Sequence, residues 1–334
     1  MRPLRTAPMI AWARRRDDLP ALPCVGHRVA RFTTETATHE RPIPVQRLPI
    51  LGYPLDATPL ESVLRAGLAA AGSETEMERW ERKAHQLGAA VAELRSDDVI
   101  GALVAAPHKE KAATLLDALS DDARASGAVN VVVRDGAKLR GYNSDLDGIR
   151  VGLAAILPKV KGKWPRNAVV LGAGGGARAA VAVLIQSGMQ RVTVFNRHLH
   201  KAESLVTHMA RSARHMELRA RPWHEAILEV ELARAPLLVN ASGLGDRDGS
   251  PVPAALLTEG MWILDLVLAA GPTPLMEAAT AQGATAANGQ AAFLAGAAES
   301  IRRLTGKAGS AEALREALAA ELGVATTEVA VVGD

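Results

Sequence analysis

The sequence predicts an α/β protein with two domains, each built on a largely parallel sheet. Short apolar runs typical of buried strands alternate with helical segments along most of the chain, and this alternation favours parallel pairing. One stretch, residues 167–197, combines a strand, a glycine-rich turn, a helix and a second strand. A chain of 334 residues is also long enough to form two hydrophobic cores.

The glycine-rich turn has the spacing of a dinucleotide-binding fingerprint, the mark of a Rossmann fold. Gly172 permits the tight turn, Gly174 lets the backbone approach a pyrophosphate, and Ala177 allows close packing of helix on strand. The helix N-terminus then offers free N–H groups to the phosphates. The alternative is a glycine turn in an α/β core that binds no ligand. The cofactor-binding residues predicted from this turn are Gly172, Gly174, Gly175, Gly176 and Ala177.

The end of the second strand indicates which dinucleotide is bound. This strand ends in Asn196 and Arg197, basic residues follow, and the first carboxylate is Glu203. A carboxylate at the strand end would accept the ribose 2′-hydroxyl of NAD, whereas an arginine accommodates the 2′-phosphate of NADP. The sequence therefore favours NADP(H) over NAD(H). We assign no role to His198 and His200, which fit a solvated helix start equally well.

Composition excludes several classes of protein. Hydrophobic residues make up 48% of the chain and charged residues 22%, as in ordinary globular proteins. The net charge of +3 gives no case for a nucleic-acid partner. No apolar run reaches the length of a membrane span, so we expect no membrane partner. A single cysteine, Cys24, fits a reducing compartment, and we expect a cytoplasmic protein.

Residues 1–46 differ from the rest of the chain. They are rich in arginine and proline and show little periodicity. A secretory signal would need an apolar segment after its charges, which is missing here. A transit peptide remains an alternative, although the acidic residues count against it. We interpret residues 1–46 as a poorly ordered extension, or as the result of a start codon assigned too early.

Hydrophobic periodicity predicts the elements of the first half. Strands are expected where short apolar runs occur, and helices where apolar residues recur on one face. The predicted elements are a strand over 48–51, helices over 60–71 and 76–95, a strand over 99–105, a helix over 110–119, a strand over 128–133 and a helix over 146–157.

The second half continues the alternation after the nucleotide unit. The predicted elements are a helix over 201–211, strands over 216–219, 237–240 and 261–267, and helices over 274–283, 289–305 and 311–322. The last of these is an Ala/Leu/Glu helix that we expect to pack back on the first half.

Two residues of the first half have the chemistry of an acid–base pair. Lys109 follows a strand end, which places it at the carboxyl edge of a parallel sheet, where ligands bind in open α/β folds. Asp145 also follows a predicted strand–turn segment. A lysine beside a carboxylate can act as a general acid or base. Taken alone, each residue fits a solvated surface position better.

Six motifs together resemble the shikimate dehydrogenase family. They occur in the order in which the family has them and cover roughly residues 47–322. The motifs are PHKEKA at 107–112, GAVNVVV at 127–133, GYNSDLDGI at 141–149, GAGGGARAA at 172–180, NRHLHKA at 196–202 and VNASGLG at 239–245.

The resemblance implies an α/β substrate domain and a Rossmann NADP domain with a cleft between them. The substrate domain would comprise residues 47–146, with helices of about 290–322 packing back on it, and the Rossmann domain residues 147–289. The implied reaction is hydride transfer between NADPH and C3 of 3-dehydroshikimate, giving shikimate. No metal is expected, and the protein would be a monomer or homodimer acting on a small molecule.

The resemblance also implies roles for individual residues. Lys109 corresponds to the catalytic lysine and Asp145 to its paired aspartate, while Asn130 corresponds to the asparagine that binds ring hydroxyls. Asn196 and Arg197 correspond to the clamp on the 2′-phosphate, in agreement with the charge argument. The loop beside the cofactor corresponds to Asn240, Ala241 and Ser242.

The departures from the family pattern all fall on the substrate side. The first motif of the family carries two serines, whereas this chain has a shorter segment without serine in which Asp56 occurs and Thr58 could supply one hydroxyl. The expected threonine is Ala105, the expected tyrosine is Leu268, and the expected glutamine is Gly296, with Gln290 close enough in sequence to substitute. The alternatives are therefore a dehydrogenase of quinate or of another cyclic hydroxy acid or polyol, or a weakly active nucleotide-binding paralogue.

Overall fold

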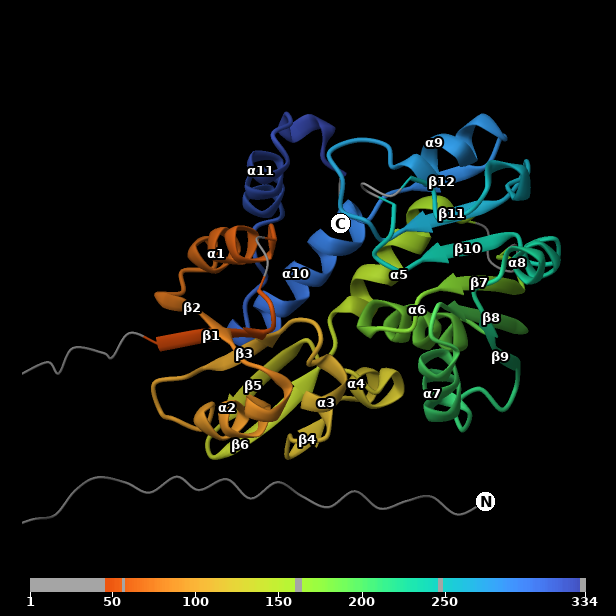
Figure 1. Ribbon diagram of the computed structural model, residues 1–334. Helices are drawn as coiled ribbons and strands as arrows, with labels where there is room; N and C mark the ends of the chain where they lie inside the picture. The colour runs from red at the N-terminus through yellow and green to blue at the C-terminus, as the bar shows by residue number, and fades with distance from the viewer. Residues whose placement is uncertain (1–45, 56–57, 160–163, 246–248, 331–334) are drawn as a thin grey trace, which may run out of the picture. The chain divides into compact units, whose positions relative to one another are not determined.

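Two six-stranded sheets form the framework of the protein (Figure 1). The computed structural model describes residues 46–55, 58–159, 164–245 and 249–330. The predicted extension, apart from Gln46, and Asp56 therefore lie outside the described residues. All described residues belong to one unit, Pro44–Asp334.

The first sheet is mixed, with the strand order β2-β1-β3-β5-β6-β4. β2 and β3 both pair with β1 in parallel, whereas β5 is antiparallel to β3 and to β6. Its strands are β1 (Gln46–Gly52), β2 (Thr75–Glu81), β3 (Gly101–Val104), β4 (Ala118–Leu119), β5 (Val131–Asp135) and β6 (Lys138–Tyr142).

The second sheet is entirely parallel, with the order β12-β11-β10-β7-β8-β9. Counted from β7, this is the order 3-2-1-4-5-6 of doubly wound dinucleotide-binding folds. Its strands are β7 (Asn167–Leu171), β8 (Arg191–Asn196), β9 (Glu217–Pro222), β10 (Leu237–Asn240), β11 (Trp262–Asp265) and β12 (Thr285–Ala287). The prediction of an α/β fold with a Rossmann half is confirmed.

Helices cover both faces of each sheet, so each half has two layers of apolar packing. The helices are α1 (Leu60–Ala70), α2 (Leu87–Glu93), α3 (Lys109–Ala113), α4 (Asp121–Ser126), α5 (Asp145–Ile156), α6 (Gly175–Gln186), α7 (Leu199–Met209), α8 (Glu225–Leu232), α9 (Pro274–Ala281), α10 (Gln290–Thr305) and α11 (Ala311–Leu322).

The last two helices of the chain pack on the first sheet. Ile301 of α10 and Leu314 and Leu318 of α11 share one core with Leu48 of β1 and Val63 of α1. Figure 1 shows α10 and α11 beside α1, although most of the sequence separates them. The other face of the first sheet packs against α2, α3 and α4. The second sheet packs against α5, α6 and α7 on one face and against α8 and α9 on the other.

The prediction of one helix over residues 76–95 is wrong. The segment forms the edge strand β2 and then, after a short turn, the helix α2. Met77 and Trp80 of β2 are buried, while the Glu and Arg residues between them are mostly exposed or partly exposed. The segment is rich in polar residues that favour helices, but these residues lie on the solvent side of an edge strand. Parallel pairing with β1 overrides their local helix propensity.

The predicted helix over residues 110–119 is also too long. α3 ends at Ala113, and residues 118–119 form the short strand β4 beside β6. The carboxylate of Asp117 accepts a hydrogen bond from the backbone N–H of Leu139 (2.7 Å), which turns the chain into this pairing. The sequence did not predict α4, α8, β6 or β12.

Candidate active site

Four strands of the first sheet have a terminus on the same side of the sheet, the side where β1 ends; we call this side the sheet edge. β1, β3 and β6 run in the same direction and end at this side, whereas β5 is antiparallel to them and begins at it. Asn130 immediately precedes β5. Lys109 begins α3, which follows β3, and Asp145 begins α5, which follows β6. The topology thus places three predicted site residues at the same sheet edge.

Lys109, Asp145 and Asn130 form one hydrogen-bonded group. The ammonium of Lys109 donates to Oδ2 of Asp145 at 2.7 Å. The amide of Asn130 donates to Oδ1 of the same carboxylate at 2.8 Å. The side chains of Lys109 and Asp145 are 23% and 25% exposed, so each is partly covered and still accessible. Asp145 therefore holds Lys109 in place, and Asn130 holds Asp145.

Two serines that the sequence analysis did not single out support this group. The hydroxyl of Ser144 accepts from the Asn130 amide at 2.9 Å and lies 2.8 Å from the hydroxyl of Ser300 on α10. The backbone N–H of Ser144 donates to Oδ1 of Asn130 at 2.8 Å. Because Ser300 is far away in sequence, only the packing of α10 against α5 reveals its place beside the site.

The glycine turn of the Rossmann half is shaped by close contacts. Gly172 has φ +106°, and a Cβ there would lie 2.5 Å from the carbonyl oxygen of Ala241. Only glycine tolerates both this backbone conformation and this approach. By contrast, a Cβ at Gly174 would meet nothing within 4 Å. The turn is therefore fixed on its inner side and open on its outer side.

The lysine of the first half lies directly over the glycine turn. A Cβ at Gly175, the first residue of α6, would lie 2.7 Å from Cδ of Lys109. Beside this contact, Arg178 of α6 pairs with Glu110 of α3 at 2.8 Å. Arg178 is only 4% exposed, and the sequence analysis did not single it out. The two halves thus meet at the residues expected to bind substrate and cofactor.

A cavity of about 570 Å³ extends from the lysine to the end of β8. We name it the shared cavity, because residues of both halves line it. Of the predicted residues, Lys109, Gly172, Gly174, Gly175, Asn196, Arg197 and Ser242 line this cavity, and Ala106, Pro107, Glu110, Ala173, Arg178, His198, His200, Lys201, Ser204 and Ala241 complete the lining.

The remaining predicted cofactor residues have supporting positions. Ala177 is fully buried, as expected for close packing of α6 on the sheet. Gly176 follows Gly175 in the first turn of α6. Asn240 is also fully buried and does not line the shared cavity. Its amide donates to Asp265 and to the carbonyl of Leu244, both at 2.8 Å, so that it shapes the loop that carries Ser242.

Asp265 is a buried carboxylate that the sequence analysis did not single out. Burial raises the pKa of its carboxyl, while hydrogen bonds from Thr273, the backbone N–H of Val267 and Asn240 act in the opposite direction. These three donors join the ends of β10 and β11 to the start of α9. Asp265 therefore organises the loops beside the cavity and does not face it.

A second cavity of about 200 Å³ lies at the β1 end of the same sheet edge. We name it the side cavity, and it shares Ala106 with the shared cavity. Thr58 and Ala105, two positions where this chain departs from the family pattern, both line it. Its full lining is Ile50, Pro54, Leu55, Thr58, Leu60, Glu61, Arg79, Ala105 and Ala106.

Gln290 does not line either cavity. Its amide nitrogen donates to the carbonyl of Ala269 at 2.8 Å, and its oxygen accepts from the backbone N–H of Ala330 at 2.9 Å. Both polar atoms are thus occupied where α10 begins. Gly296, six residues later, lines neither cavity and packs against the start of α5, where a Cβ would lie 3.4 Å from the carbonyl oxygen of Ser144.

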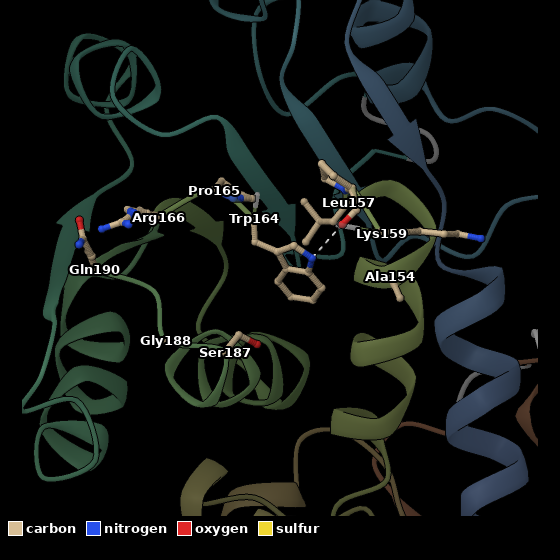
Figure 2. Close-up of a pocket in the computed structure, with 10 residues that line it drawn as sticks. Ala154, Leu157, Lys159, Trp164, Pro165, Arg166, Ser187, Gly188 and Gln190 are labelled. Carbon is tan, nitrogen blue, oxygen red and sulfur yellow. Dashed lines mark hydrogen bonds between the residues drawn. The ribbon is translucent and has the colours of Figure 1, made fainter. Parts of the chain in front are cut away.

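A further cavity, of about 840 Å³, lies away from Lys109, Asp145 and Asn130, none of which lines it. Figure 2 shows Trp164 beside Leu157, with its indole N–H donating to the carbonyl of Pro158 at 3.1 Å. Lys159 and Arg166 are the charged side chains of its lining, and no carboxylate is among the ten lining residues. Volume alone does not make this cavity a catalytic site, since it has no acid–base pair.

The residues of the shared cavity fit a dinucleotide. The open outer side of Gly174 leaves room for a backbone approach, and α6 begins at the next residue with unpaired N–H groups. Arg197 is exposed at the end of β8, and His200 and Lys201 line the cavity beside it. Positive charge thus lies where a 2′-phosphate would be bound.

The described ranges contain neither a candidate metal site nor a candidate membrane span. Among residues 46–55, 58–159, 164–245 and 249–330, no three His, Cys, Asp or Glu side chains gather closely enough to hold a metal ion. None of the helices in these same ranges is long and apolar enough to cross a membrane.

These features define the class: a protein of two α/β halves, in which a Rossmann nucleotide site faces a lysine–aspartate pair. Two family models match the chain. "Shikimate dehydrogenase substrate binding domain" matches residues 50–132, and "Shikimate / quinate 5-dehydrogenase" matches residues 156–231.

Individual relatives agree with the family models. The shikimate dehydrogenase (NADP(+)) of Symbiobacterium thermophilum is 32% identical, over 84% of this chain and 95% of its own. The structure of shikimate 5-dehydrogenase from Thermus thermophilus with NADP(H) and shikimate is 29% identical, with a TM-score of 0.68 and coverage of 82% of this chain and 98% of its own. Quinate dehydrogenase from Corynebacterium glutamicum with NAD is 26% identical, with a TM-score of 0.71 and coverage of 83% and 99%. The chain belongs to the shikimate dehydrogenase family.

Proposed function

We propose that the protein is an NADP-dependent oxidoreductase that interconverts 3-dehydroshikimate and shikimate. The observation that carries the proposal is the contact between Lys109 and the glycine turn, because it brings the lysine of an acid–base pair into the cavity that the nucleotide-site residues line. The family to which the chain belongs, and the NADP named for its relatives, support the same activity.

In this proposal Lys109 handles the proton of the reaction. Bound NADP(H) would supply or accept the hydride at the carbon that is reduced or oxidised. The Lys109 ammonium would donate its proton to the substrate oxygen as negative charge develops there, and would take it back in the reverse direction. Asp145 would keep Lys109 oriented through their 2.7 Å contact and would bind a neighbouring hydroxyl.

The other site residues would bind and orient. Asn130, which holds Asp145, would also contact a ring hydroxyl of the substrate. Asn196 and Arg197 would clamp the 2′-phosphate of NADP, and Ser242 would border the cofactor. Thr58 would offer a hydroxyl to the substrate from the side cavity. The glycines of the turn would receive the diphosphate.

The proposal assigns the two halves of the chain to the two ligands. Residues 47–146 would bind substrate, with the helices of about 290–322 completing that half, and residues 147–289 would bind NADP. We propose a cytoplasmic protein that works as a monomer or homodimer, which light scattering during gel filtration would distinguish.

A second candidate is a dehydrogenase of quinate or of another cyclic hydroxy acid or polyol. Ala105, Leu268 and Gly296 offer no side-chain hydrogen bond where polar side chains were expected. A site that is built to pair with hydroxyls loses about 1–3 kcal/mol for each missing partner. These positions favour a substrate that differs from shikimate on that side.

One panel of assays tests both candidates. Shikimate, quinate and related polyols are each offered with NADP and with NAD, and the absorbance of the reduced nicotinamide is followed. We expect NADP reduction with shikimate. Turnover of quinate or a polyol alone would support the second candidate. Tight NADP binding without turnover of any compound would indicate a nucleotide-binding paralogue and would refute the enzymatic proposal.

A further inference from the structure

The side cavity has mostly apolar walls and three polar side chains. Six of its nine lining residues are Ile50, Pro54, Leu55, Leu60, Ala105 and Ala106, and the polar ones are Thr58, Glu61 and Arg79. Since the side cavity and the shared cavity have Ala106 in common, and Lys109 follows three residues later, a ligand at Lys109 would extend toward this group.

Arg79 reaches the side cavity from β2. It pairs in register with Ile50 of β1, and its guanidinium donates to the carbonyl of Leu55 in the segment that follows β1. The sequence pattern predicts a helix over residues 76–95, so Arg79 is not among the candidates that it indicates. The strand instead carries it to the same sheet edge as Lys109 and Asp145.

The charges around Arg79 leave part of its guanidinium free to bind an anion. Glu61 lies 3.8 Å from Arg79 but only 2.9 Å from Arg65, which is its closer partner. The ammonium of Lys83 lies 5.7 Å from the centre of the Tyr53 ring, on the same segment after β1. Arg65, Arg79 and Lys83 thus bring three positive charges to this end of the first sheet, which favours a negatively charged group.

We propose that Arg79 binds the carboxylate of the substrate, with Thr58 as a second donor. This inference rests on the proposed function, because the carboxylate belongs to the cyclic hydroxy acid that Lys109 would act upon. A guanidinium presents several N–H donors in a planar fork that matches a carboxylate, and this pairing is stronger than one to a neutral group. The apolar walls would then face the carbon ring.

The test compares Arg79→Gln with Arg65→Gln on two substrates, shikimate and its methyl ester. Both arginines pair with Glu61, but only Arg79 lines the side cavity. We expect Arg79→Gln to raise KM for shikimate roughly ten- to a hundredfold, as for a lost hydrogen bond to a charged group. KM for the methyl ester should change far less. Arg65→Gln should leave both values near those of the wild type.

Arg79→Lys provides a second variant with the charge retained. It should recover part of the affinity for shikimate, which a purely structural role would not predict. An unchanged KM for shikimate in Arg79→Gln, or an equal rise for acid and ester, would overturn the proposal.

Calorimetric binding of shikimate separates this proposal from the proposed function. If the wild type turns over no substrate, the proposed function fails, yet binding can still be compared between the wild type and Arg79→Gln. Binding that is lost in the variant supports the role of Arg79. Equal binding, or no binding of shikimate to the wild type, overturns it.

Discussion

At the scale of single residues, Lys109 is constrained from two sides. Its ammonium is held by Asp145 at 2.7 Å, and its carbon chain crosses the glycine turn at Gly175. Asn130 and Ser144 fix Asp145 in turn. The position of Lys109, the proposed proton donor, relative to the glycine turn is thus set by packing as well as by its ion pair.

Replacing Lys109 with alanine should remove activity and spare cofactor binding. We expect Lys109→Ala to lower kcat with shikimate by a factor of roughly 100 to 10,000, the usual contribution of a positioned acid or base. The Kd of NADP, measured by fluorescence titration, should change little. Lys111→Ala, an exposed lysine of the same helix, is the control. Retained turnover in Lys109→Ala would refute the proton-transfer role.

A methyl group at position 175 should disturb the lysine without removing it. In Gly175→Ala the new Cβ meets Cδ of Lys109, so the side chain must move. Small displacements of a catalytic group are costly, and we expect kcat to fall roughly ten- to a hundredfold. Gly271→Ala, where nothing lies within 4 Å, is the matched control. A normal kcat in Gly175→Ala would show that the contact has no role.

Residue-level prediction from sequence succeeded where a motif is local. The glycine turn and the residues after β8 are contiguous, so their relation can be read directly, and six of the predicted cofactor residues line the shared cavity. Ser300, Arg178 and Glu110 could not be found in this way, because their contacts join segments far apart in the chain. Gln290 illustrates the opposite error. Its proximity in sequence to Gly296 suggested a contact with substrate, but both polar atoms of its side chain are hydrogen-bonded to backbone groups.

At the scale of elements, the close approach of α5 and α10 places Ser300 beside Ser144 and Asn130. A Cβ at Gly148 of α5 would collide with the backbone carbonyl of Ala292 in α10. We expect Gly148→Ala to lower the free energy of unfolding by about 1–3 kcal/mol, as for overpacking in a core. Urea denaturation measures this change.

Gly88→Ala is the matched control for this helix contact. Gly88 is exposed in α2, and a Cβ there meets nothing within 4 Å. The substitution should stabilise the protein by about 0.5–1 kcal/mol, because alanine favours helix. If both alanines had the same effect, the packing argument for α5 and α10 would be wrong.

Asp117 links the end of α2 to β6 and should make stability depend on acid pH. Hydrogen bonds from Arg95 and from the backbone N–H of Leu139 lower the pKa of its carboxyl from 3.8 to about 2. A carboxyl whose pKa is lowered on folding stabilises the folded state above the unfolded pKa. This contribution is therefore complete above about pH 4 and is lost as the pH falls toward 2. Between pH 4 and pH 2, the melting temperature of Asp117→Asn should therefore fall less than that of the wild type.

The control for the acid experiment is Asp135→Asn. Asp135 is an exposed carboxylate at the end of β5 in the same sheet. Its replacement should leave the acid dependence close to that of the wild type. Parallel curves for the wild type and Asp117→Asn between pH 4 and 2 would contradict the assignment.

Element prediction failed mainly at the edge of the first sheet. Central strands such as β7 are buried on both faces, so their apolar runs were recognised. β2 is an edge strand with exposed charged residues, and its composition is that of a surface helix. Its identity depends on pairing with β1, which a local pattern cannot reveal.

At the scale of the whole molecule, an ion pair beside the site joins the two halves. Arg178 and Glu110 connect α6 to α3, and the buried arginine depends on this carboxylate for its charge partner. A double-mutant cycle with Glu110→Gln and Arg178→Met should give a coupling of about 1 kcal/mol in the free energy of unfolding, a modest value because Glu110 is half-exposed. Additive effects would mean that the pair does not join the halves.

The overall architecture could be predicted because it follows from alternation and from one glycine turn. The parallel second sheet, with its order 3-2-1-4-5-6, is what such a turn between strand and helix indicates. The mixed first sheet could not be derived in the same way, since β5 and β6 form an antiparallel hairpin whose second strand was not recognised.

The return of α10 and α11 to the first sheet has a consequence for biosynthesis. Leu48 and Val63 share a core with Ile301, Leu314 and Leu318, so the earliest sheet to leave the ribosome cannot be completed until translation is nearly over. The core of the Rossmann half is drawn from a continuous span, residues 146–284. Its formation therefore does not require α10 and α11, although it is encoded second, and a released chain that ends at Gly289 should yield a protease-resistant fragment from that span.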